Sequence, residues 1–296
     1  MLIHNPEFIN YQATSLKGNL YVVATPIGNM EDITLRALKI LGQVDIIAAE
    51  DTRHTKKLLS FYKIKGRLIS CHEHNERKKI PALLDKLNSG LSVALVSNAG
   101  TPLLSDPGYH LIKGAAASGI QIIPAPGVSA AITALSVAGL PTDSFVFAGF
   151  PARKKAKRLE QLKQLAGERR TIIFYESPKR ILKFLEEIIM VLGDRKGVLS
   201  REMTKLHEEY IRSDLSDILF RLKERPEVKG ECTLLVGGCK KKKDISMKTV
   251  SDEIKKRLQI KGTRLSELAK EMSKQYNIPK NKVYNEGLKI KRLMSS

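Results

Sequence analysis

The 296-residue sequence has few cysteines and no long hydrophobic run. Its cysteines, Cys71, Cys232 and Cys239, form no Cys-x-x-Cys pair, and an odd number of scattered cysteines favours reduced thiols over a secreted disulfide framework. Apolar runs such as residues 93–96 and 120–123 are far shorter than the ~20 residues that span a bilayer. The first residues also lack the charged and apolar regions of a signal peptide. We therefore expect a cytoplasmic protein that does not enter a membrane.

Two common nucleotide-binding motifs are absent as well. No Gly-x-Gly-x-x-Gly follows a predicted strand, and no Gly-x-x-x-x-Gly-Lys-Ser/Thr occurs. These motifs normally hold the phosphates of dinucleotide cofactors and of nucleoside triphosphates. Their absence argues against nicotinamide-dependent and P-loop chemistry.

Positive charge is abundant. The chain has 51 Lys and Arg against 31 Asp and Glu, a formal net charge of +20. A field of this strength attracts polyanions, so nucleic acid is the expected partner. A basic protein with no nucleic-acid role, or one that touches anionic membrane surfaces, is the alternative.

Short β-branched runs alternate with helical patterns, which predicts an α/β fold with two α/β domains, residues 18–139 and 140–239. A turn-rich stretch, Gly139 to Asp143, marks the boundary. Helices are expected to start near Asp32, Thr52, Asn75, Asp106 and Gly127 in the first domain. Strands are expected at residues 20–24, 45–49, 67–71, 93–97, 121–124, 145–150, 171–175, 197–201 and 232–236.

The C-terminal part has a different character. Four lysines at 240–243 predict a hydrophilic linker, because like charges resist compaction. Residues 244–296 then predict a small basic helical module of helix-turn-helix type, with apolar residues at helical spacing on both sides of Pro279. Its use is open between base-reading DNA recognition, general RNA binding and packing.

Three predicted strands of the first domain end in small, turn-forming residues, at 25–29, 97–102 and 124–129. The carboxyl ends of parallel strands meet at one edge of the sheet, where ligands bind to backbone amides and helix N-termini. Glycine lets a ligand approach the backbone closely. Each loop alone could be an ordinary turn, but three at one edge predict a ligand site.

These loops belong to longer strings that resemble the ribosomal RNA methyltransferases with the tetrapyrrole-methylase fold, and within them the small-subunit methyltransferase I family. The similarity runs from about Gly18 to Gly238. The strings that carry it are residues 23–29 (VATPIGN), 48–55 (AAEDTRHT), 72–76 (HEHNE), 97–108 (SNAGTPLLSDPG) and 174–178 (FYESP).

The resemblance implies two α/β domains of tetrapyrrole-methylase type with S-adenosylmethionine in the cleft between them, a homodimer and a helical appendage. It also implies 2′-O-methylation of a decoding-centre cytidine, cytidine 1402 of 16S rRNA, with small-subunit ribosomal RNA or the assembled small subunit as partner. The alternatives are a small-molecule tetrapyrrole methyltransferase of the same fold and a non-catalytic nucleic-acid-binding regulator.

The resemblance also implies a set of cofactor-binding positions. One departs from the family, which usually has Asp where this chain has Asn98. That departure puts a carboxylate role there in doubt, but not a role of the backbone. The implied positions are Pro26, Gly28, Asn98, Ala99, Gly100, Thr101 and Ser129 in the first domain, and Tyr175, Gly230, Glu231, Cys232 and Thr233 in the second.

Catalytic candidates follow the second predicted strand. A ribose hydroxyl is a poor nucleophile until its proton leaves, so Glu50, Asp51 or His54 could accept that proton. Arg53 is suited to clamp a neighbouring phosphate, although Asp51 and Arg53 could instead form an ion pair that caps the next helix. His72 and His74 are reserve proton acceptors. They share one face if their segment is a strand, but the methyl transfer needs no metal and we expect none.

A basic cluster after the strand at 145–150 is the expected RNA-binding element. Cations at a helix N-terminus oppose the helix dipole, so phosphate binding is an alternative to a solvated helix start. The cluster consists of Arg153, Lys154, Lys155, Lys157 and Arg158.

Overall fold

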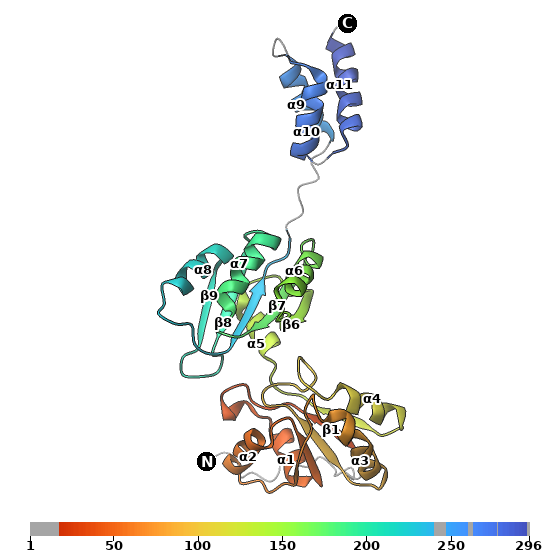
Figure 1. Cartoon of the computed structure of the whole chain (residues 1–296), viewed down its shortest axis with the longest axis vertical. Coiled ribbons are helices and arrows are strands. Elements are labelled where there is room, and N and C mark those ends of the chain that lie inside the picture. Colours follow the sequence, from red (N-terminus) through yellow and green to blue (C-terminus); the bar gives the residue numbers. More distant parts are fainter. Residues whose placement is uncertain (1–17, 240–246, 260–262, 277, 295–296) are drawn as a thin grey trace. The chain divides into compact units, whose positions relative to one another are not determined.

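The structure is a computed structural model, and it describes residues 18–239, 247–259, 263–276 and 278–294 (Figure 1). Two compact units divide the chain, residues 1–239 and residues 240–296. The lysine run at 240–243 and Asn277 of the predicted break lie outside the described residues. The first unit contains both sheets, and the second is helical.

The first sheet has five parallel strands in the order β3-β2-β4-β1-β5. Residues of α1 and α2 cover one face and those of α3 and α4 the other. The strands are therefore buried on both sides, as parallel strands usually are. The elements are β1 (Leu20–Val23), a 3₁₀ turn η2 (Met30–Asp32), α1 (Leu35–Gln43), β2 (Ile46–Ala49), α2 (Thr52–Phe61), β3 (Leu68–Ser70), α3 (Glu76–Asn88), β4 (Val93–Val96), α4 (Tyr109–Ala117) and β5 (Ile122–Ala125).

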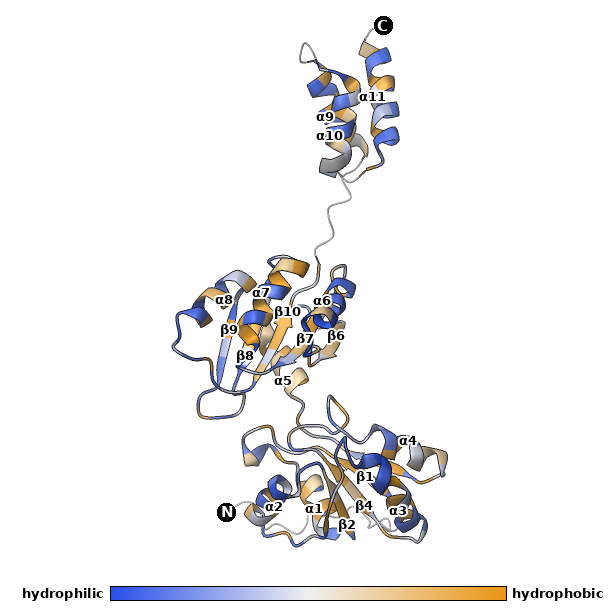
Figure 2. Cartoon of the chain, viewed as in Figure 1, coloured by the Kyte–Doolittle hydropathy of each residue, from blue (hydrophilic) through white to orange (hydrophobic). Residues whose placement is uncertain are grey.

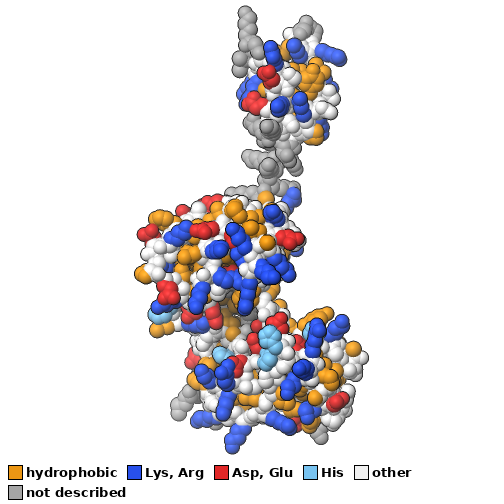
Figure 3. All heavy atoms as spheres, in the orientation of Figure 1, with side chains coloured by type: hydrophobic (Ala, Val, Ile, Leu, Met, Phe, Trp, Pro, Cys, Tyr) orange, Lys and Arg blue, Asp and Glu red, His pale blue; other side chains and the backbone are white. Residues whose placement is uncertain are grey.

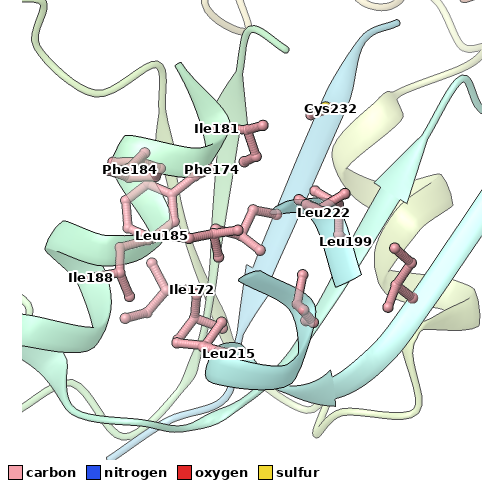
Figure 4. Packing of buried hydrophobic residues seen from close by; sticks show 14 of the residues in the cluster. Ile172, Phe174, Ile181, Phe184, Leu185, Ile188, Leu199, Leu215, Leu222 and Cys232 are labelled. Carbon is pink, nitrogen blue, oxygen red and sulfur yellow. The ribbon is translucent and has the colours of Figure 1, made fainter. Parts of the chain in front are cut away.

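The second sheet is mixed, with the order β6-β7-β10-β8-β9. Only β6 and β7 are parallel, and the other neighbours run antiparallel. Its largest core packs Phe174 of β7 and Leu199 of β8 against Phe184 of α7 and Leu215 of α8 (Figure 4). The elements are β6 (Phe145–Gly149), α6 (Lys155–Gln164), β7 (Thr171–Glu176), α7 (Ile181–Leu192), β8 (Lys196–Arg201), β9 (Glu209–Asp214), α8 (Leu215–Lys223) and β10 (Cys232–Val236).

Helix α5 (Ala130–Ala138) precedes the predicted boundary at 139 but packs on the second sheet. Its Ala131, Ala134 and Leu135 share a buried cluster with Ile173 of β7 and Leu235 of β10. Small alanine side chains let the helix lie close to these strands. The core of the second sheet therefore begins before the turn that punctuates the sequence.

The predicted strands all form, with ends within two residues of those expected, but β9 and α8 were missed. Strand β9 is an edge strand that carries Glu209, Arg212 and Asp214, and charged side chains are typical of edges. Such a strand has no continuous apolar signal.

The described residues of the C-terminal unit form three helices, α9 (Met247–Leu258), α10 (Leu265–Tyr276) and α11 (Lys280–Met294). Helix α9 was not expected as a separate element. Val250 and Ile254 of α9, Leu268 and Met272 of α10, and Val283 of α11 make a small core. Figure 2 shows hydrophilic and hydrophobic residues alternating along the three helices. Among the described residues, no helix is long and apolar enough to span a membrane.

Candidate active site

A hollow of about 480 Å³ lies between the loops of the two sheets. Its size is in the usual range for small-molecule sites. Residues from both sheets line it, as the cleft expected from the resemblance requires. The predicted cofactor positions among them are Asn98, Ala99, Gly100, Thr101, Ser129, Tyr175, Glu231, Cys232 and Thr233.

The three strand-end loops of the first sheet are tied together at this hollow. The backbone amide of Thr25 donates to the Gly100 carbonyl and that of Gly100 to the Thr25 carbonyl, each at 2.9 Å. The Thr101 hydroxyl donates to the Val128 carbonyl at 3.0 Å. Gly100 has φ +79°, a conformation that side chains with a Cβ rarely adopt. A Cβ there would meet only ordinary contacts at 3.5 Å, so backbone conformation rather than lack of space requires glycine.

At position 98, where the resemblance leads us to expect aspartate, the asparagine makes two hydrogen bonds. Its side-chain oxygen accepts from the Asp51 amide at 3.2 Å, and its own amide donates to the Glu50 carboxylate at 3.2 Å. These two bonds fasten the end of β2 to the loop after β4. An aspartate could accept the same bond, so what this chain gives up is a negative charge beside Glu50.

The second sheet contributes β7 and the start of β10. Cys232 pairs with Glu176 across these antiparallel strands, which places Tyr175 and Thr233 at the same edge. The Tyr175 hydroxyl accepts a bond from the Ala131 amide at 3.0 Å, and burial raises the pKa of this phenol. Burial likewise raises the pKa of the Cys232 thiol to about 12, so it is a neutral wall of the hollow.

A loop between β8 and β9 connects the second sheet to the first. The Thr204 hydroxyl accepts from the Asn29 amide at 3.0 Å, and the Lys205 ammonium pairs with Glu202 at 3.0 Å and Glu231 at 3.1 Å. Gly230 contacts this loop and does not line the hollow. It has φ +86°, and a Cβ there would collide with the Glu202 side chain.

Two predicted cofactor positions, Pro26 and Gly28, line a smaller neighbouring cavity of about 230 Å³ together with His54. That cavity shares Ile27, Asn98, Ala99 and Glu231 with the hollow. Pro26 and Gly28 therefore lie beside the first hollow and do not line it.

A second hollow, of about 700 Å³, adjoins the first. Glu50, Ser105 and Asp106 line both. Figure 3 shows acidic and histidine side chains in the region between the two sheets, with lysine and arginine on the surrounding surface. The other residues that line the second hollow are His72, Glu73, His74, Glu76, Arg77, Pro107, Gly108, Tyr109 and His110.

Asp106 was expected only as a helix start, but α4 begins at Tyr109 and Asp106 lies in the preceding loop. Burial, and then the charge of Glu50, raises the pKa of Asp106 to about 6, although a hydrogen bond with Ser97 acts in the opposite direction. A raised pKa in a hollow is a signal of function that needs the fold. The sequence held only the weaker signal that Asp106 belongs to the string 97–108.

The structure corrects the expectation for Asp51 and Arg53. Asp51 is the N-cap of α2, where its carboxylate accepts from the Arg53 amide at 2.9 Å and pairs with the Arg53 guanidinium at 2.9 Å. These bonds lower the pKa of Asp51 to about 2, which makes it a poor proton acceptor. Neither residue lines the hollows described above, so the alternative of a helix-capping ion pair holds.

His72 and His74 follow β3 in a loop, so the condition for a shared strand face is not met. Their rings still meet edge to face, with centroids 6.0 Å apart, and both line the second hollow. Asn75 orders the loop, because its side-chain oxygen accepts from the His72 amide at 2.8 Å. In the part of the chain that the structure describes, no group of three or more residues is arranged to hold a metal ion.

The basic cluster divides into exposed and buried members. Arg153, Lys154, Lys155 and Lys157 are exposed at the start of α6. Arg158 is buried, and its guanidinium donates to the Glu187 carboxylate at 2.8 Å and to the Ala152 carbonyl at 2.9 Å. Arg158 is therefore a structural residue and not a phosphate contact, because its helical position turns it toward α7.

Comparison with known proteins agrees with this arrangement. Residues 19–219 match the family of Tetrapyrrole (Corrin/Porphyrin) Methylases. The cobalt precorrin-4 methyltransferase CbiF is similar in fold, with a TM-score of 0.55 at 21% identity over 74% of this chain and 95% of that one. Uroporphyrin-III C-methyltransferase of Thermus thermophilus, complexed with S-adenosylhomocysteine, gives a TM-score of 0.52 at 18% identity over 74% and 97%. The fold and site thus define an S-adenosylmethionine-dependent methyltransferase of this class.

Relatives of higher sequence identity are named "Ribosomal RNA small subunit methyltransferase I". That of Halalkalibacterium halodurans is 42% identical over 93% of this chain and 96% of its own length. That of Vibrio cholerae is 46% identical over 91% and 94%. The chain therefore belongs to the small-subunit methyltransferase I family within the tetrapyrrole methylases. The resemblance read from the motif strings is confirmed.

Proposed function

We propose that this protein transfers a methyl group from S-adenosylmethionine to a ribose 2′-hydroxyl of small-subunit ribosomal RNA, at the decoding-centre cytidine expected from the resemblance. The observation that carries the proposal is the pair of hollows that share Glu50, Ser105 and Asp106. The cofactor would bring an activated methyl group on a sulfonium to the first hollow. The names of the close relatives support ribosomal RNA as the substrate.

The second hollow suits the neutral part of a nucleotide. Glu50, Glu73, Glu76 and Asp106 would repel a phosphate, whereas the ribose hydroxyls and the base can bond to such groups. Ring side chains offer surfaces for stacking on a base, as RNA-binding proteins commonly do. These rings belong to His72, His74, Tyr109 and His110.

The two rival functions fit less well. A tetrapyrrole substrate carries several carboxylates, and these would face the acidic side chains of the second hollow with Arg77 as the one cation among its lining residues. A non-catalytic regulator would have no use for two adjoining hollows.

We further propose that the protein acts in the cytoplasm as a homodimer. Exposed apolar side chains of α5 and of the loop between β8 and β9 support self-association. Ile132 and Val137 of α5 are 51% and 42% exposed, and Leu206 of the loop is 93% exposed. Light scattering should give a mass near twice that of the 33.0 kDa chain.

Transfer of labelled methyl groups tests the proposed function. Small subunits from cells that lack this protein should accept methyl groups, and ribose methylation should appear as one site resistant to alkaline hydrolysis. Small subunits from cells that contain the protein should accept none. Free 16S rRNA, offered in parallel, distinguishes naked RNA from the assembled subunit as the substrate. Methylation of a uroporphyrinogen but of neither RNA substrate would refute the proposal.

A further inference from the structure

Asp106 and Glu50 stand where a reacting hydroxyl would have to lie, on the wall common to both hollows. Glu50 follows β2, and its carboxylate is held by the Asn98 amide at 3.2 Å. Asp106 lies between β4 and α4. Among the described residues, neither carboxylate pairs with a lysine or an arginine, unlike most carboxylates of the second sheet.

The segment that carries Asp106 is conformationally strained. Leu103 and Ser105 have φ of +74° and +69°, which non-glycine residues rarely adopt, and Gly108 follows with φ +122°. A Cβ at Gly108 would come within 2.7 Å of Leu95, so the chain is pressed against β4 there. Strain of this kind persists only where surrounding structure enforces it. Here it sets the direction of the loop that presents Asp106.

Resting on the proposed function, we propose that the Asp106 carboxylate is the catalytic proton acceptor for the ribose 2′-hydroxyl, and that Glu50 is a positioning residue that acts through it. The bond from the 2′-oxygen to the methyl carbon forms as the bond from that carbon to the sulfonium sulfur breaks. The hydroxyl proton passes to Asp106, and the sulfur leaves as a neutral thioether, so charge and atoms balance.

The electrostatics support this role. A carboxyl with a pKa of about 6 is mostly ionised at pH 7 and is a far stronger base than Asp51, whose pKa is about 2. The other titratable groups that face the two hollows are further acids, imidazoles, phenols, one thiol and one guanidinium. They are Glu73, Glu76, Glu176, Glu231, His72, His74, His110, Tyr109, Tyr175, Cys232 and Arg77.

The main test is the pH dependence of single-turnover methylation. In the wild type the rate should rise with pH through a midpoint near 6, because the ionised carboxylate is the active form. Asp106→Asn should lower the rate by ~10²–10⁴-fold, the usual share of a general base, and should remove this midpoint. Glu50→Gln should keep a measurable rate and move the midpoint down, but not to the ordinary value for aspartate, because burial, the larger cause of the raised pKa, remains.

Stability and NMR provide readouts that do not depend on turnover. A carboxyl whose pKa is raised in the folded state loses stability as pH rises through that pKa, so at pH 7 its charge destabilises the fold. Asp106→Asn should therefore raise the Tm by at least ~2 °C, whereas loss of a purely structural carboxylate would lower it. The Asp106 carboxyl carbon, assigned by its absence from Asp106→Asn, should titrate near 6 and shift down in Glu50→Gln.

Control variants separate this role from its rivals. Asp85→Asn makes the same chemical change at an exposed position of α3 and should alter neither the midpoint nor the Tm. His72→Gln and His74→Gln should leave the midpoint in place if Asp106 is the acceptor. The Asp85 control should bind S-adenosylmethionine with wild-type affinity. Because Asp106 and Glu50 line the first hollow, the single-turnover rates of their variants are compared at saturating cofactor.

A rate within threefold of wild type for Asp106→Asn would overturn the proposal, as would a midpoint that Glu50→Gln leaves unmoved. Loss of the midpoint in a histidine variant would assign the proton to that ring instead. If the wild type methylates no RNA, the proposed function is wrong, and a ribose 2′-hydroxyl cannot be the group that gives its proton to Asp106. The NMR midpoint would then still decide whether Glu50 acts on Asp106.

Discussion

Two carboxylates, Glu209 of the second sheet and Asp106 beside the first, are held in opposite ways. In the second, Glu187 pairs with buried Arg158, and Glu209 lies between Arg201 and Arg225, which lower its pKa to about 2. In the first, burial and then the charge of the neighbouring Glu50 carboxylate raise the pKa of Asp106. Paired carboxylates favour their charged form and support the fold, whereas an acid beside another acid is kept ready to take a proton.

The sheets also differ in how they form a site. All strands of the first are parallel, so their carboxyl ends gather at one edge by topology alone. In the second, the carboxyl end of β7 meets the amino end of β10 because those strands are antiparallel. The site therefore combines the carboxyl ends of parallel strands with the start of β10. The rule that ligands bind at the carboxyl ends of parallel strands would not have predicted the start of β10 as part of the site.

The largest expected effect concerns the buried pair of the second sheet. Arg158→Ala leaves Glu187 buried without its partner, which should lower the free energy of unfolding by about 3–5 kcal/mol. Urea unfolding measures this. The opposite sign is expected for Asp106→Asn, so the two variants together test whether the sheets differ as described.

Lys157→Ala, next to Arg158 but exposed, is the matched control and should change stability by no more than ~0.5 kcal/mol. Replacing both Arg158 and Glu187 by methionine should recover much of the lost stability, since apolar side chains can fill the same space. A loss below ~1 kcal/mol for Arg158→Ala would show that water reaches this pair and that it contributes little.

The next effect concerns the strand-end loops of the first sheet. Gly100→Val should reduce affinity for S-adenosylmethionine at least tenfold, because a left-handed conformation costs an L-residue about 1–2 kcal/mol and a β-branched one more. Relaxing that strain would break the bridge to Thr25. Calorimetry with the cofactor measures the change.

Gly90→Val is the control for this experiment. Gly90 also has a positive φ, +90°, but it lies in the turn between α3 and β4, and a Cβ there would meet open space. It should strain the fold to a similar degree and leave cofactor affinity intact. Equal losses of affinity in both variants would mean that general destabilisation is responsible and not the loop.

Much of the first sheet could be predicted from the sequence, and less of the second. The buried runs at β2 and β4 are continuous and apolar, so they stand out. Edge strand β9 and the packing of α5 depend on partners far along the chain, which no local pattern records. At the site, backbone loops near Gly100 were predictable from strand ends. Asp106 and Arg158 were not, because burial and neighbouring charge give each its role.

The smallest expected effect concerns the cations outside the site. The side chains of Arg153, Lys154, Lys155 and Lys157 are exposed at the start of α6, where they can contact phosphates. The acidic side chains of the second hollow would repel phosphates. Changing all four to glutamine should weaken RNA binding and reduce the slope of log affinity against log salt by roughly 0.7 for each phosphate that is no longer neutralised. Cofactor affinity and stability should stay unchanged.

Truncation after Cys239 is compared with the four-glutamine variant, because it removes the C-terminal unit, which has its own core. If that unit also binds RNA, truncation should lower the slope further and additively, since distant phosphates release their counterions independently. A full salt slope in the four-glutamine variant would instead place the RNA entirely on other surfaces, and the exposed charge of α6 would serve only solvation.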